Sequence, residues 1–164
     1  MTSSEESDLT TKVLAVLGSL ALGFCALINA ILAAMALFSG HLIGAIGDAS
    51  EKTNLDAHLT SDAHHAALVA KIIAIAFAVL AALEFGAGEF LRRRLRNLIV
   101  PIACAATIAG EAGFSIWASR FTALDAILIA CALFAAWTWW RLPRRDSGAA
   151  EFESAADRGR RFAV

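Results

Sequence analysis

The side chains with the clearest chemical potential in this sequence are carboxylates set inside long apolar runs. Glu84 interrupts the run 66–90, and Glu111 interrupts the run 97–117. An ionised carboxylate at the centre of a bilayer costs at least about 2.5–3.5 kcal/mol, so acids at such positions are candidates for function. A neutral carboxyl there can exchange a proton or donate a hydrogen bond. Each acid is therefore expected to have one of two roles. The preferred one is a hydrogen bond that joins helices or subunits, and the alternative is a relay for protons or cations.

Other polar side chains fall at helical spacing near these acids. Thr107 and Ser115 stand four residues before and after Glu111, so a helix would place all three on one face. Asp125 lies near the start of the last apolar run, where it can pair with Arg120 or cap its helix. The predicted intramembrane polar network comprises Asn29, Glu84, Thr107, Glu111, Ser115 and Asp125.

All histidines of the chain lie between the first two apolar runs, at His41, His58, His64 and His65. Neutral imidazole is a common metal ligand, so this set is a candidate site for zinc, copper or a haem edge. The spacing is not diagnostic, and none of these residues lies deep in an apolar run. A solvated or interfacial role is preferred. No resident cofactor is predicted, whereas bound lipids are expected.

The cysteines give no sign of redox or zinc chemistry. Cys25, Cys104 and Cys131 each fall inside an apolar run and have no CxxC neighbour. A cysteine in such a place behaves as a small apolar side chain. The chain also lacks a Walker loop, GxGxxG, HExxH and GxSxG. We therefore expect a protein that is not an enzyme.

The elements that must position these groups follow from the composition. The chain has 164 residues, of which 59% are hydrophobic, against about 45–50% in soluble domains. A spanning helix needs about 20 mostly apolar residues, and backbone polar groups in lipid must be paired internally. The sequence predicts an all-α, polytopic membrane protein with a bundle of transmembrane helices. The expected segments are an N-terminal region 1–12, spans at about 13–38, 66–90, 97–117 and 122–140, an outer loop 39–65, and a polar tail 141–164.

Basic residues predict the orientation. Arg92, Arg93, Arg94 and Arg96 lie between the second and third spans, and Arg141, Arg144 and Arg145 follow the fourth. The segment 39–65 has a single basic residue besides histidine, Lys52. The positive-inside rule then places both termini in the cytoplasm, and a bacterial inner membrane is expected. The Arg92–Arg96 group sets topology and attracts anionic lipid headgroups, while Glu89 is expected to pair with Arg93. Nucleic-acid binding is excluded for so short a cluster beside the membrane.

Small residues suggest how the spans meet. Gly40, Gly44 and Gly47 are expected to end the first helix, and Ser61 with Asp62 to cap the second. Small or polar residues at helical spacing form one stripe per span, and such stripes favour close helix packing. The fourth stripe is expected at Asp125, Ile129, Ala132 and Ala136.

Three functions remain open at this point. The preferred one is a small non-catalytic accessory subunit of a larger energy-transducing or transport complex in the membrane. The first alternative is a small homo-oligomeric transporter or channel that uses Glu84 and Glu111 for protons or cations. The second alternative is a subunit that binds a metal, haem or quinone through the histidines. The expected partners are membrane lipids and other membrane subunits, in a hetero- or homo-oligomer.

Overall fold

The computed structural model describes residues 3–142 except 54–56 and 96, and these residues form four α-helices. They are α1 (Ser3–Lys52), α2 (Ala57–Arg92), α3 (Ile99–Trp117) and α4 (Ala123–Arg141). All four are long and apolar enough to cross a membrane. The chain is thus an all-helical protein with the features of an integral membrane protein, as predicted. Arg144, Arg145 and the tail beyond Leu142 lie outside the described residues, as does Arg96.

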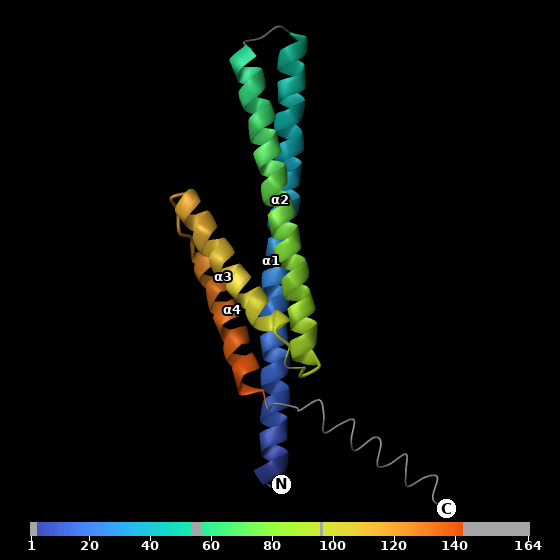
Figure 1. Cartoon of the computed structure of the whole chain (residues 1–164), viewed down its shortest axis with the longest axis vertical. Helices are drawn as coiled ribbons and strands as arrows, with labels where there is room; N and C mark the ends of the chain where they lie inside the picture. Colours follow the sequence, from blue (N-terminus) through green and yellow to red (C-terminus); the bar gives the residue numbers. More distant parts are fainter. Residues whose placement is uncertain (1–2, 54–56, 96, 143–164) are drawn as a thin grey trace, which may run out of the picture.

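The helices form two antiparallel hairpins of different length (Figure 1). With its 50 residues, α1 is about 75 Å long, whereas the 19 residues of α3 span about 28 Å, close to the hydrocarbon thickness of a bilayer. The α3–α4 hairpin packs against the α1–α2 hairpin, beside the half of it in which the N-terminus lies. The other half continues past the α3–α4 turn. We call this part, residues 40–52 and 57–70, the projecting hairpin.

The segment 39–65 differs from the expected outer loop, because residues 39–52 and 57–65 are helical. The three glycines do not end α1, and Ser61 does not cap α2, which already begins at Ala57. The reason is the α1–α2 contact. A Cβ on Gly40 would lie 3.2 Å from both the Ala67 carbonyl oxygen and the Ala70 Cβ. Glycine lets the two backbones approach, which outweighs its helix-propensity cost of about 1 kcal/mol.

The buried face of α3 includes Thr107, Glu111 and Ser115, as their spacing predicted, whereas the buried face of α4 is shifted from the predicted stripe. The buried positions of α4 are Asp125, Leu128, Ala132, Ala135 and Thr138, while Ile129 and Ala136 are half-buried. Gly18 of α1 is buried, and a Cβ there would overlap the Thr138 hydroxyl. This close fit sets the rotation of α4 against α1, which the apolar run alone could not specify.

The connection between α3 and α4 has defined local structure. Thr122 and Asp125 form a capping box at the start of α4, with the Thr122 hydroxyl accepting from the Asp125 backbone N–H at 3.3 Å. This confirms the predicted capping role of Asp125. At the end of α3, Ser119 adopts a left-handed φ of 51°, and the Arg120 N–H donates to the Ser115 carbonyl.

Candidate functional site

A buried carboxyl group ties three helices together at the depth where all four helices are packed. Glu84 of α2 and its partners Asn29 of α1 and Thr107 of α3 are each 0% exposed. The Asn29 side-chain amide donates to both carboxyl oxygens of Glu84 at 3.0 and 2.9 Å, and the Thr107 hydroxyl oxygen lies within hydrogen-bond distance of one of them, at 2.6 Å. None of the ion pairs within the described ranges involves Glu84.

The hydrogen bonds around Thr107 suit a neutral carboxyl. Thr107 Oγ1 also lies 3.0 Å from the Ala103 carbonyl oxygen, but a hydroxyl has a single hydrogen to donate. A protonated Glu84 that donates to Thr107, while Thr107 donates to Ala103, satisfies both contacts. It also avoids the cost of an unpaired charge away from water. The arrangement can hold one proton between Glu84 and Thr107.

A second polar cluster lies further along α3, toward its C-terminal end. Glu111 and Ser115 are buried and lie close enough to Asp125 of α4 to interact with its carboxylate. Asp125 also accepts hydrogen bonds from the backbone N–H and hydroxyl of Thr122. Glu111 Oε1 and Ser115 Oγ form no hydrogen bond within the described structure.

The structure brings the predicted polar residues together as two clusters that share one face of α3. Thr107 belongs to the Glu84 cluster, and Glu111 follows one turn later. The Glu84 and Glu111 carboxyls are close enough for an electrostatic interaction. A row of oxygen-bearing side chains thus extends from Glu84 toward Asp125.

Sulfur atoms lie beside the Glu84 cluster, which the sequence reading missed. Cys25 is buried, its Sγ donates to the Leu128 carbonyl at 3.8 Å, and it interacts with Cys131, Cys104 and Glu84. The three cysteines come from α1, α3 and α4 and are all free thiols. Their common depth could have been found by counting residues from the predicted span ends.

The predicted histidine set is not gathered into one site. His41 and His64 line a cavity of about 500 Å³ between α1 and α2, together with Asp48 and Lys71. In the described part of the chain, the only group of three or more metal-ligating residues consists of Asp48, Glu51 and His64. His58 and His65 are not members. The two carboxylates were missed because they belong to a segment read as a loop.

The arginines at the end of α2 and just after it form the expected ion pair and two more. Glu89 accepts from Arg92 at 2.7 and 2.8 Å and from Arg93 at 2.6 Å, so the predicted Glu89–Arg93 pair is confirmed. Arg94 Nη1 donates to Asp8 at 2.8 Å, which joins the α2–α3 connection to the start of α1. This end of the molecule therefore gathers charge, as a membrane–water interface requires.

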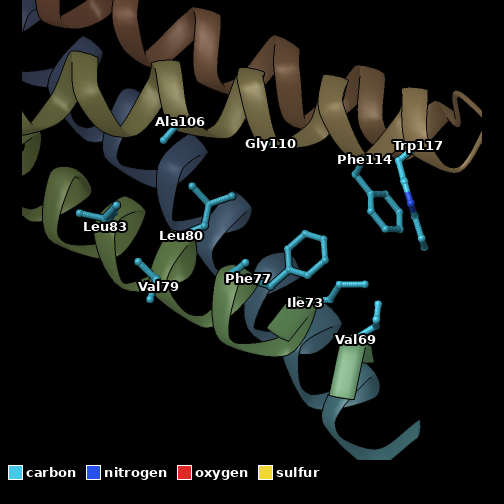
Figure 2. A pocket seen from close by; sticks show the side chains of 11 residues that line it. Val69, Ile73, Phe77, Val79, Leu80, Leu83, Ala106, Gly110, Phe114 and Trp117 are labelled. Atoms are coloured by element: carbon cyan, nitrogen blue, oxygen red, sulfur yellow. The ribbon is translucent and has the colours of Figure 1, made fainter. Parts of the chain in front are cut away.

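An apolar groove separates α2 from α3 where the hairpins diverge (Figure 2). Its volume is about 720 Å³, and it ends at Phe114 and Trp117 of α3. Phe77 of α2 meets Phe114 edge-on, with ring centroids 5.8 Å apart. The lining residues are Val69, Ile73, Ala76, Phe77, Val79, Leu80, Leu83, Ala106, Gly110, Phe114 and Trp117. None of them carries a charge, a hydroxyl or a side-chain carbonyl, so the Trp117 indole N–H is the one side-chain group among them that could bind a ligand headgroup.

The geometry thus offers a buried cluster around Glu84, a second carboxyl cluster, an apolar groove, and a projecting hairpin that carries both polar and exposed apolar side chains. Each of the four helices contributes to one or more of these features. Comparison of the chain with protein-family models, curated proteins and solved structures found no match.

Proposed function

We propose that this chain is a non-catalytic accessory subunit of a larger integral membrane complex, of the energy-transducing or transport kind. Both termini would lie in the cytoplasm of a bacterial cell, because the arginines at the N-terminal end of the bundle favour that side. The projecting hairpin would then lie outside the cytoplasm. In this role the buried acids hold the helices in place, and the outer surface meets lipids and other subunits.

The observation that carries this proposal is the apolar surface of the projecting hairpin. Leu42 and Ile46 lie one turn apart on α1 and are 55% and 59% exposed. Both belong to the projecting hairpin, where the helices carry histidine, aspartate and glutamate. Apolar side chains gain nothing by facing water, so a protein surface is the natural cover for this pair.

Co-purification from native membranes tests the proposal. When the chain is extracted in lipid-retaining nanodiscs, another membrane protein should co-purify with it in fixed stoichiometry. The double variant Leu42→Ala/Ile46→Ala should lose that protein. The matched control is Ile72→Ala/Ile75→Ala, whose side chains are 57% and 65% exposed but lie within the apolar run of α2. Recovery of the chain alone, or equal retention by both variants, would count against the proposal.

A second candidate is a proton- or cation-coupled transporter formed by several copies of the chain. The row of oxygen-bearing side chains from Glu84 to Asp125 favours it, because such a row can relay a proton between buried carboxyls. Flux into proteoliposomes should then fall in Glu84→Gln and Glu111→Gln, while the exposed control Asp62→Asn keeps the wild-type rate. Unchanged flux in both glutamine variants removes this candidate.

A further inference from the structure

Two carboxylates and one imidazole converge on the projecting hairpin, from two helices. Asp48 and Glu51 lie one turn apart on α1, and His64 faces them from α2. One ligand atom from each lies within 4.8 Å of the other two, and His64 Nε2 is 3.8 Å from Asp48 Oδ1. All three side chains are exposed, so water and ions reach them freely.

The close packing of α1 and α2 produces this convergence. A Cβ at Gly47 would lie 3.3 Å from the Ala63 Cβ and 3.4 Å from His64 Nε2. The missing side chain therefore lets α2 approach, and the imidazole lies across the α1 backbone toward Asp48. A side chain at position 47 would therefore require Ala63 or the His64 ring to shift.

The donor set of one nitrogen and two oxygens has a defined metal preference. Zinc accepts both imidazole and carboxylate, at about 2.0–2.2 Å, and commonly has three protein ligands with water in the fourth position. Tetrahedral bonds of that length put ligand atoms roughly 3.3 Å apart, closer than the 3.8 Å between His64 Nε2 and Asp48 Oδ1 and the 4.8 Å within which all three ligand atoms lie. Small rotations of exposed side chains close that difference. Magnesium and calcium prefer oxygen ligands alone, so the imidazole disfavours them.

The cavity between α1 and α2 gives an ion access to these three side chains. Its volume is about 500 Å³, and His64 and Asp48 line it together with His41 and Lys71. It is open at the surface of the hairpin and bordered by polar groups, so a hydrated ion can enter and keep a water ligand. The cavity belongs neither to the Glu84 cluster nor to the apolar groove.

We propose that Asp48 and Glu51 of α1 and His64 of α2 bind a divalent transition-metal ion of the zinc type. The ion joins the two helices near the tip of the projecting hairpin. Binding requires the folded hairpin, because the ligands come from both of its helices, and the ion therefore stabilises it.

The test is zinc binding by the full-length chain, without a histidine tag, in detergent and in competition with a chromogenic chelator. We expect one Zn²⁺ per chain. Losing an outer-shell partner already weakens metal binding 10–100-fold, so His64→Ala and Asp48→Asn should each lower the affinity at least about tenfold. His65→Ala is the matched control, because it removes the adjacent exposed imidazole, and should bind as the wild type does. Excess Mg²⁺ should not displace the zinc.

Several results would overturn the assignment. They are wild-type affinity no higher than that of His64→Ala, an equal loss in His65→Ala, or displacement by Mg²⁺. The substituted positions are exposed, so all variants should fold, and a second readout confirms this. Zinc should raise the melting temperature of the wild type and of His65→Ala, but not that of His64→Ala. The co-purification test of the proposed function uses no metal, so either proposal can fail without the other.

Discussion

Asn29 and Glu84 are 55 residues apart in the sequence, and the Asn29 amide reaches both carboxyl oxygens of Glu84 in the middle of the helix bundle. The bond joins α1 to α2, and Thr107 adds α3 to the same group. Hydrogen bonds of this kind hold helices together where water is absent and the hydrophobic effect gives no preference between lipid and protein.

The Asn29–Glu84 bond should contribute measurably to stability. Asn29→Ala leaves a buried carboxyl without its amide donor, so we expect a loss of about 1–3 kcal/mol. Glu84→Gln keeps an acceptor and gains donors, and should lose less than Glu84→Ala, which also creates a cavity. Unfolding in mixed detergent micelles measures these differences. Exposed Asp62→Asn is the control, and wild-type stability of Asn29→Ala would show that the bond contributes nothing.

Gly18 should tolerate no side chain. A Cβ at this position overlaps the Thr138 hydroxyl, so Gly18→Ala should destabilise the α1–α4 contact by about 1–3 kcal/mol. Gly23 has nothing within 4 Å of a Cβ, and Gly23→Ala should be neutral or stabilising by up to about 1 kcal/mol.

The double variant Gly18→Ala/Thr138→Ala tests the cause of the Gly18 effect. Removing the hydroxyl relieves the overlap, so the two changes should be non-additive in a double-mutant cycle. Additive losses would mean that the α1–α4 contact differs from the one described.

Replacing Ser119 with glycine should stabilise the protein. Its φ of 51° costs a residue with a side chain about 1–2 kcal/mol, whereas glycine adopts this conformation freely. Ser119→Gly should therefore raise the free energy of unfolding by about 1 kcal/mol. Ser119→Ala serves as the comparison, because it removes the hydroxyl but keeps the Cβ. Equal stability of the two variants would argue against a left-handed residue here.

Membrane-impermeant maleimide should reveal the orientation. Ser50→Cys should react in intact cells, and Arg93→Cys only after permeabilisation, because the arginine-rich connection favours the cytoplasm. The wild type provides the background: Cys25 and Cys104 are buried and Cys131 is half-buried within the bundle, so its labelling should be low. Reaction of both introduced cysteines from the same side would reject the proposed topology.

Much of the fold follows from local patterns in the chain. The apolar runs predict four helices, because unpaired backbone groups are too costly in lipid. The Glu89–Arg93 pair and the capping role of Asp125 could be predicted as well, since each depends on residues within one helical turn. The buried face of α3 follows from the spacing of Thr107, Glu111 and Ser115.

The sequence by itself determined which segments are helical and apolar, and which polar groups those segments carry, since both depend on neighbouring residues. Only the tertiary structure decided which groups meet. Helix rotation and the approach of two backbones depend on contacts between distant residues, such as Gly18 with Thr138 or Gly47 with His64. For the same reason the continuation of α1 through three glycines, and the meeting of His64 with Asp48, could not be read from spacing along the chain.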